Sequence, residues 1–190
     1  PVQRKVAKKY SWLPLVKLQE LIKSDIHEHR LVSLFILIYK YKKADEYERG
    51  NIINFYLKNT KNINNWDLVD LSAPKILGNF LLNKKRKILY DLANSENLWE
   101  RRIAVLSCFE FIRNHEFEDA LKISELLLKD NHDLMHKAIG WMLREIGKRN
   151  QNVLEDFLKK HYEQMPRTML RYSIEKFPED LRKKYLNGEI

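Results

Sequence analysis

The segment His136-Lys137-Ala138-Ile139-Gly140 returns in related form at three other places along the chain. The related segments are His29-Arg30-Leu31-Val32-Ser33, Arg101-Arg102-Ile103-Ala104-Val105 and Leu170-Arg171-Tyr172-Ser173-Ile174. Their second residues lie at positions 30, 102, 137 and 171, and a further repeat near Trp66 fills the double gap between the first two. A period of about 35 to 40 residues built from helix pairs is typical of a HEAT-like α-solenoid. A plain bundle whose amphipathic helices align by chance is the alternative.

The rest of the chain also predicts an all-α fold. Apolar residues recur every three or four positions, and five Gly and five Pro leave little material for the tight turns of a β-rich fold. Pro74 is expected to kink or split the helix that contains it. About ten helices are predicted, at 15–23, 27–43, 46–59, 65–80, 84–93, 98–113, 117–129, 132–148, 151–163 and 167–176, with a short terminal helix after Pro178.

Length and composition narrow the class of protein further. The 190 residues fit one domain, 1–190, and the longest apolar stretch, Leu31 to Tyr39, is too short to cross a bilayer. The single cysteine, Cys108, excludes an internal disulfide framework and favours a cytoplasmic protein. The net charge of +9 favours a polyanionic partner. Because the chain runs from Pro1 straight into basic, helix-like sequence, we expect that further N-terminal residues are missing.

Cations at the repeated position predict a binding groove. In a solenoid, equivalent positions lie along one face, so the antiparallel helix pairs should form a concave basic groove that follows a phosphate backbone. A solvated charged face, or capping within helix pairs, is the alternative. Helical spacing of three and four adds Trp141 and Arg144 to the face of Lys137, and joins Arg167 to Arg171. The predicted groove cations are Arg30, Arg102, Lys137, Arg144, Arg167 and Arg171.

The segment from Ile63 to Asp70 is the strongest candidate for chemistry. Trp66 and Asp70 are four residues apart and therefore share one helix face. A carboxylate beside an aromatic plane stabilises positive charge by Coulomb attraction and through the ring quadrupole. Asp67 points elsewhere and suits the positive end of the helix dipole. On spacing alone, the tryptophans of the chain are more typical of core residues than of a cation-stabilising site.

Three motifs resemble the DNA alkylation repair family, the AlkD-type DNA glycosylases. They are Asn65-Trp66-Asp67-Leu68-Val69-Asp70, Leu98-Trp99-Glu100-Arg101-Arg102-Ile103-Ala104 and Lys137-Ala138-Ile139-Gly140-Trp141-Met142-Leu143-Arg144-Glu145. Their order matches that of the family. The segment from Met165 to Ile174 is similar to the family's last basic helix, and the resemblance runs from about residue 27 to residue 176.

The resemblance implies a right-handed array of HEAT-like repeats that binds duplex DNA and excises cationic N3- and N7-alkylated purines by hydrolysis. It implies a catalytic role for Asp70, cleft contacts to the deoxyribose backbone for Trp66 and Trp141, and a phosphate contact for Arg102. Water is the nucleophile, so no cofactor or metal is expected, and the protein should act as a monomer without an obligate protein partner. The family's N-terminal helices have no counterpart before Pro1.

The sequence is also compatible with two other functions. A non-catalytic nucleic-acid-binding HEAT-repeat module would use the same cations, and a protein scaffold would use the concave face for an acidic peptide. His132 and His136 have the spacing of metal ligands, but they lack a third ligand, and His27-Glu28-His29 alternates around its helix. The run from Lys84 to Lys87 is read as a solvated helix start or a secondary phosphate contact, and Cys108 as a buried small apolar residue.

Overall fold

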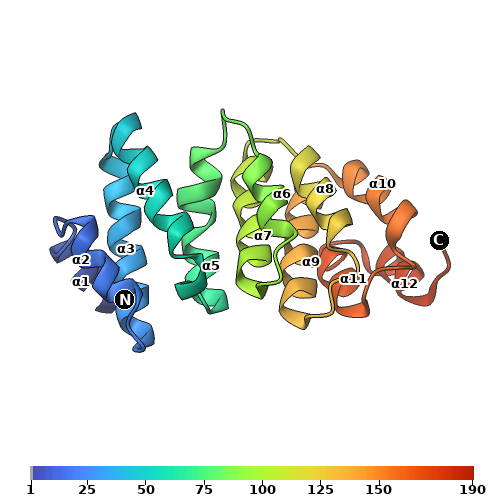
Figure 1. Ribbon diagram of the computed structural model, residues 1–190. Helices are drawn as coiled ribbons and strands as arrows, with labels where there is room; N and C mark the ends of the chain where they lie inside the picture. The colour runs from blue at the N-terminus through green and yellow to red at the C-terminus, as the bar shows by residue number, and fades with distance from the viewer. Residues whose placement is uncertain (1) are drawn as a thin grey trace.

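The computed structural model describes residues 2–190, and this part of the chain contains helices and no strand, which confirms the all-α prediction. The array runs from α1 at one end to α12 at the other, with the two termini at opposite ends (Figure 1). The elements are α1 (Val2–Lys9), α2 (Leu15–Ile22), α3 (His27–Lys43), α4 (Glu46–Lys58), η1 (Thr60–Asn62), α5 (Trp66–Ser72), η2 (Pro74–Gly78), α6 (Lys87–Ala93), α7 (Leu98–Arg113), α8 (Glu118–Leu126), α9 (Asp133–Gly147), α10 (Gln151–His161), α11 (Arg167–Ser173) and α12 (Glu179–Asn187).

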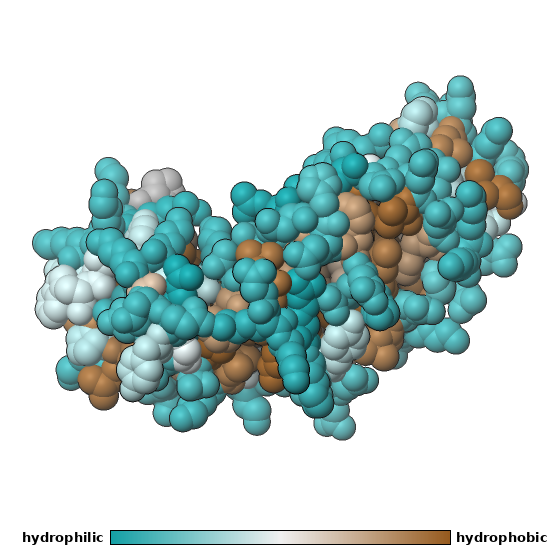
Figure 2. Space-filling model, turned by 90° about the horizontal axis from the view of Figure 1, so that it is seen from above, coloured by the Kyte–Doolittle hydropathy of each residue, from teal (hydrophilic) through white to brown (hydrophobic). Residues whose placement is uncertain are grey.

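Two layers of helices make up an α-solenoid. We call α3, α5 with η2, α7, α9 and α11 the inner layer, because each of these helices packs directly on the next. Helices α6, α8 and α10 pack on the inner layer and approach one another less closely, so the array bends toward the inner layer. Figure 2 shows this bent outline, which is hollowed on one side between the two ends.

None of the helices in residues 2–190 has both the length and the apolar character that a membrane span requires. The core instead runs as one continuous apolar seam between the layers, and it includes Leu37, Leu68, Ile103, Ile139 and Leu170. Each of these residues lies on a different helix of the inner layer. Burial of these side chains holds neighbouring repeats together.

The expected break at Pro74 takes the form of a π-helical turn. Helix α5 ends at Ser72, and η2 continues from Pro74 in the same direction, with the Gly78 amide donating to the Ala73 carbonyl at 2.9 Å. Proline has no amide hydrogen to donate, so the ladder widens there. A Cβ at Gly78 would lie 2.4 Å from the Ser107 carbonyl oxygen, so glycine permits the close approach of η2 to α7.

Gly140 has the same role two repeats later, between α9 and α11. A Cβ on Gly140 would lie 2.5 Å from the Cβ of Tyr172 and 2.6 Å from the Met169 carbonyl oxygen. The glycine of the repeated segment therefore brings α9 and α11 into contact through their backbones. This contact fixes the position of α11 and its two arginines, Arg167 and Arg171.

Helix boundaries differ from the prediction mainly around basic segments. Helix α1 was not predicted as an element, and α6 begins at Lys87 instead of residue 84. The reason for the later start is Arg86, whose guanidinium donates to the carbonyl oxygens of Leu81 (3.2 Å) and Leu82 (2.8 Å) and so holds the preceding turn. Its Cζ also lies 3.7 Å from the centroid of the Phe111 ring.

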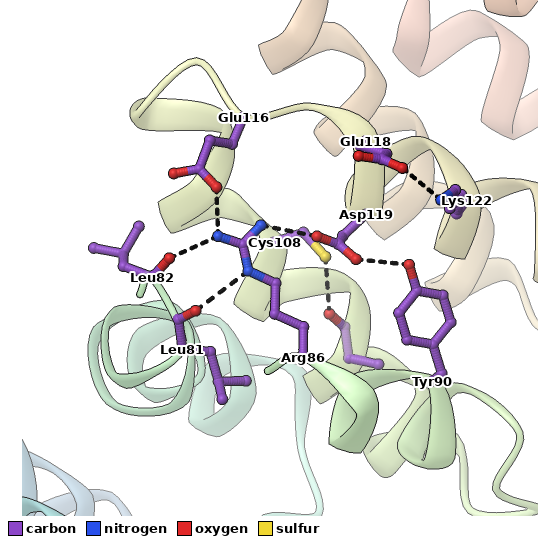
Figure 3. Close-up of polar contacts among 10 residues, drawn as sticks. Leu81, Leu82, Arg86, Tyr90, Cys108, Glu116, Glu118, Asp119 and Lys122 are labelled. Atoms are coloured by element: carbon purple, nitrogen blue, oxygen red, sulfur yellow. Dashed lines mark hydrogen bonds and ion pairs between the residues drawn. The ribbon is translucent and has the colours of Figure 1, made fainter. Parts of the chain in front are cut away.

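Arg86 has two acidic partners, one in α8 and one in the loop that precedes it (Figure 3). Its Nη1 donates to Asp119 at 2.8 Å, its Nη2 pairs with Glu116, and the Tyr90 hydroxyl donates to the other Asp119 oxygen at 2.6 Å. The Arg86 side chain is 14% exposed. The expectation that the run from Lys84 to Lys87 is a solvated face or a phosphate contact is therefore wrong for Arg86, which joins the turn after η2 to α8.

Cys108 lies beside this network and donates from Sγ to the Ala104 carbonyl oxygen at 3.4 Å. It is buried, as expected, and burial raises the pKa of its thiol. A buried thiol that stays protonated packs as a small apolar group.

Replacing Arg86 should destabilise the fold strongly. In Arg86→Met the Asp119 carboxylate loses its cation while it remains largely buried, which should lower the free energy of unfolding by about 3 kcal/mol. Urea titration followed by circular dichroism measures this change. The neighbouring Lys87→Met removes only an exposed pair with Asp91 and should cost about 0.5 kcal/mol or less. Equal stability of the two variants would contradict the structural role of Arg86.

Candidate functional site

A bidentate ion pair between Asp70 of α5 and Arg102 of α7 lies at the centre of the inner layer. Arg102 Nε donates to Asp70 Oδ1 and Arg102 Nη2 donates to Asp70 Oδ2, both at 2.8 Å. The third nitrogen, Nη1, donates to the carbonyl oxygen of Leu134 near the start of α9. One guanidinium therefore joins three successive inner helices.

Arg102 differs from the exposed groove cation that the sequence predicts. Its side chain is 5% exposed, while that of Asp70 is 17% exposed. All three nitrogens already donate to protein atoms, so Arg102 holds the Asp70 carboxylate in place instead of projecting into solvent. A direct phosphate contact by Arg102 stays a prediction, and it would require this side chain to leave its partners.

Burial raises the pKa of the Asp70 carboxyl above its usual value, more than the hydrogen bonds and the charge of Arg102 lower it. The charge of Asp67 adds to the rise. A carboxylate that has lost much of its hydration interacts more strongly with a nearby positive charge than a solvated one does. Asp70 thus combines partial access with a low-dielectric setting.

Trp66 is the first residue of α5 and lies one helical turn before Asp70. Its side chain has no packing role comparable to a core tryptophan, because the residue is 53% exposed. Asn65 before it has extended backbone angles, so the chain enters α5 sharply and leaves the indole at the helix end. The structure therefore favours a surface role for Trp66 over the alternative of a core residue.

Trp141 is half-buried on α9 and packs against Phe109 of α7, with ring centroids 5.7 Å apart and planes tilted by 45°. It lies one turn after Lys137. Helix α7 stands between α5 and α9 in the inner layer, so Trp66 and Trp141 lie on either side of the Arg102 helix. Their common contact with one sugar stays a prediction.

Backbone contacts correct the register of the cation ladder. Arg30 Nη1 donates to carbonyl oxygens six and five residues before it, those of Ser24 and Asp25. Arg101 Nη1 donates in the same way to residues 95 and 96. Arg30 is therefore equivalent to Arg101 and anchors a loop, so its assignment to the ladder is wrong.

The corrected ladder position is the fifth residue of each inner helix. This position holds an apolar residue in α3, a carboxylate in α5 and a cation in each of α7, α9 and α11. The residues are Leu31, Asp70, Arg102, Lys137 and Arg171. The candidate catalytic carboxylate thus occupies the same structural position as the three cations.

The other predicted groove cations fall into two groups. Lys137 pairs with Asp133 at 2.6 Å, and the largely buried side chain of Arg144 pairs with Glu175. Arg167 and Arg171 are exposed on α11, and neither has an ion pair within residues 2–190. The basic surface is therefore most open at α11.

A polar pair, which the sequence did not predict, flanks the ion pair between Asp70 and Arg102. His27 Nε2 of α3 lies 2.8 Å from Asp67 Oδ2 of α5, and both side chains are 30% exposed. Asp67 had been assigned only to the helix dipole. The signal that was available is that His27 opens α3 just as Trp66 opens α5, so both lie at the same end of neighbouring inner helices.

The paired histidines of α9 have structural contacts. His132 Nδ1 accepts from the Leu134 amide and caps the helix, and His136 Nε2 contacts the Asp130 carbonyl oxygen. Across residues 2–190, no three His, Cys, Asp or Glu side chains come together as a metal site would require.

Comparison with known proteins adds to this geometry. A family model described as "DNA alkylation repair enzyme" matches residues 1–177, a range that includes Trp66, Asp70, Arg102 and Trp141. The structure is similar to a solved structure described as "Predicted DNA alkylation repair enzyme from Enterococcus faecalis". That similarity has a TM-score of 0.72 and 19% sequence identity, over 92% of this chain and 82% of that chain, and it establishes the fold. No curated protein sequence matches the chain.

Removing the Arg102 guanidinium should make the burial of the Asp70 carboxylate destabilising. Arg102→Ala should lower the free energy of unfolding by about 3–5 kcal/mol at neutral pH. The folded state then binds the Asp70 proton more tightly than the unfolded chain does. The deficit should therefore be smallest below the unfolded-chain pKa of 3.8 and grow as the pH rises through the raised pKa.

Urea unfolding at several pH values measures this dependence. Arg171→Ala is the matched control, since it removes an exposed arginine at the same position of α11 and should change stability by less than about 0.5 kcal/mol. A deficit of Arg102→Ala that is independent of pH would argue against a coupled, buried pair.

Proposed function

The chain belongs to the DNA alkylation repair enzyme family, and on that premise we propose that it is a DNA glycosylase for cationic alkylpurines. The proposed reaction is hydrolysis of the N-glycosidic bond of N3- or N7-alkylated purines in duplex DNA. The observation that carries the proposal is the Asp70 carboxylate, which Arg102 holds in a fixed, partly accessible position beside the exposed Trp66. Family membership supports the coarser role of an enzyme in DNA repair.

The chemistry of the lesion suits a single fixed carboxylate. A purine alkylated at N3 or N7 carries a formal positive charge, so it leaves with the electrons of the C1′–N bond as a neutral base. Positive charge then develops on the sugar, as in other glycoside hydrolyses. Asp70 stabilises that charge by Coulomb attraction, and water completes the reaction at C1′.

The two tryptophans and the free arginines support the binding of DNA. The face of Trp66 is available for a deoxyribose or its backbone, while Trp141 offers only the part of its ring that Phe109 leaves uncovered. Arg167 and Arg171 present unpaired cations that would attract phosphates and release counterions. The net charge of +9 favours such a polyanionic partner.

A second candidate function is a nucleic-acid-binding module without catalytic activity. The observation that favours it is the pairing of Asp70, because both of its oxygens already accept hydrogen bonds from Arg102. In this case duplex DNA would bind at the inner layer and no base would be released.

Asp70→Asn should separate these two functions. Replacing the carboxylate by an amide removes the charge at nearly constant volume. The release of 7-methylguanine from methylated duplex DNA should therefore fall by at least ~100-fold, while DNA affinity stays similar. Chromatography of free bases under single-turnover conditions measures the rate, and the melting temperature checks the fold.

Asp91→Asn makes the same chemical change on the exposed outer helix α6 and should leave the rate unaltered. Equal release by wild type and Asp70→Asn would remove Asp70 from the reaction. Tight binding of duplex DNA without base release by the wild type would favour the second function.

The salt dependence of binding should identify the DNA contacts. Each lost phosphate contact reduces the slope of log K against log salt by about 0.9. The double variant Arg167→Ala/Arg171→Ala should therefore reduce the slope by about 2. Lys122→Ala/Lys159→Ala removes two exposed cations from the outer helices α8 and α10 and should leave the slope unchanged. An equal effect of both pairs would argue against α11 as a contact surface.

A further inference from the structure

His27 and Asp67 form a polar pair that has no role in the reaction proposed above. His27 is the first residue of α3, and Asp67 is the second residue of α5. Their side chains meet with His27 Nε2 at 2.8 Å from Asp67 Oδ2. Asp67 is held in turn by its other oxygen, which accepts from the Leu68 amide at 2.9 Å.

This pair lies next to the candidate catalytic carboxylate. Asp67 and Asp70 are three residues apart on α5, a spacing that brings side chains to neighbouring positions on one helix surface. The charge of Asp67 also contributes to the raised pKa of Asp70. Two polar pairs, His27 with Asp67 and Asp70 with Arg102, therefore link α3, α5 and α7, and the exposed Trp66 precedes Asp67 on α5.

The Asp67 contact determines which nitrogen of His27 is free to act. A carboxylate accepts the Nε2 hydrogen, so the neutral imidazole carries its lone pair on Nδ1. Within residues 2–190, Nδ1 has no hydrogen-bond partner, and it is not a buried atom. The ring is 30% exposed, so a water molecule has access to it.

Asp70, by contrast, is already engaged with Arg102 through both oxygens, even though burial raises its pKa. Both of its oxygens already accept hydrogen bonds from Arg102, and protonation would break a charged pair. A separate base allows Asp70 to remain ionised, and therefore attractive to the sugar cation, throughout the reaction.

We propose that His27, oriented by Asp67, is the general base that takes a proton from the attacking water. This inference rests on the proposed glycosylase function. The water oxygen forms the new bond to C1′ as the C1′–N bond breaks and its electron pair leaves with the cationic base, which becomes neutral. The water proton moves to Nδ1 of His27, and Asp67 stabilises the imidazolium until it returns the proton to solvent.

Titratable groups near His27 lie on α5, on α3 itself and, as Asp25, in the loop before α3. From α5, Asp67 contacts it directly, and Asp70 lies one turn further along in its pair with Arg102. On α3 itself, Glu28 follows, and His29 is engaged through Nδ1 with the Ser24 hydroxyl. A protonated His27 cannot accept a proton, so the proposed step requires the neutral ring.

The decisive experiment compares single-turnover release of 7-methylguanine by wild type and His27→Gln between pH 5 and 8. Wild type should lose activity toward pH 5. His27→Gln should be at least ~100-fold slower at pH 7.5 and lose most of this pH dependence, with DNA affinity unchanged. Imidazole added to His27→Ala should restore part of the rate, which a structural role would not allow. His29→Gln is the matched control on the same helix and should behave as wild type.

A second measurement does not depend on activity. Nitrogen-15 spectra of histidine-labelled protein should show His27 as the Nε2–H tautomer in the wild type and a mixture in Asp67→Asn. A wild-type Nδ1–H tautomer would overturn the inference, and so would a His27→Gln variant with wild-type rate and pH profile. In the latter case, loss of release in Asp70→Asn would leave the glycosylase function standing. Absence of release by the wild type at every pH would overturn the glycosylase function, and this inference with it.

Discussion

A single guanidinium, that of Arg102, connects three inner helices of the solenoid and holds the candidate catalytic group at the same time. Two of its nitrogens bind Asp70 on α5, and the third binds the backbone at the start of α9. Burial of both charges is costly unless the geometry is good and the remaining donors are satisfied. Here the bidentate pair with Asp70 and the contact with the Leu134 carbonyl oxygen meet that requirement. The position of the Asp70 carboxylate is therefore determined by three repeats and not by α5 alone.

Short helices gain from such contacts between repeats. Helix α5 has only seven residues before it passes into the π-helical turn at Pro74, and an isolated helix of that length is not stable in water. Its carboxylates are held from both sides, Asp67 by His27 of α3 and Asp70 by Arg102 of α7. The site is thus built on a short helix whose two acidic side chains are each held by a neighbouring repeat.

Helical periodicity was sufficient to predict the fold class and most of the helices, because the apolar seam repeats every three to four residues. The proline break was also predictable, since the missing amide hydrogen has a local effect. Register was harder. Arg30 and Arg102 align in sequence, yet only the carbonyl oxygens that each arginine meets reveal that Arg30 matches Arg101. The alignment of the four segments alone did not reveal this offset of one residue.

The candidate site was predictable in its members but not in its contacts. Asp70 and Arg102 were both singled out, yet their pairing depends on side-chain reach across 32 residues of sequence. His27 was considered only as a metal ligand, and its partner Asp67 only as a helix-dipole residue. Pairs between repeats depend on how the helices are spaced, and sequence spacing alone carries no such information.

The corrected register has an electrostatic consequence for anything that lies along the inner layer. Three successive helices place a cation at their fifth position, and the helix before them places a carboxylate there. A polyanion that follows this row would be attracted most at α11, where Arg171 is exposed, and repelled at α5, because Arg102 of α7 is buried in its pair with Asp70. The position of Asp70 in this row therefore disfavours a phosphate and favours a positively charged group of the bound molecule.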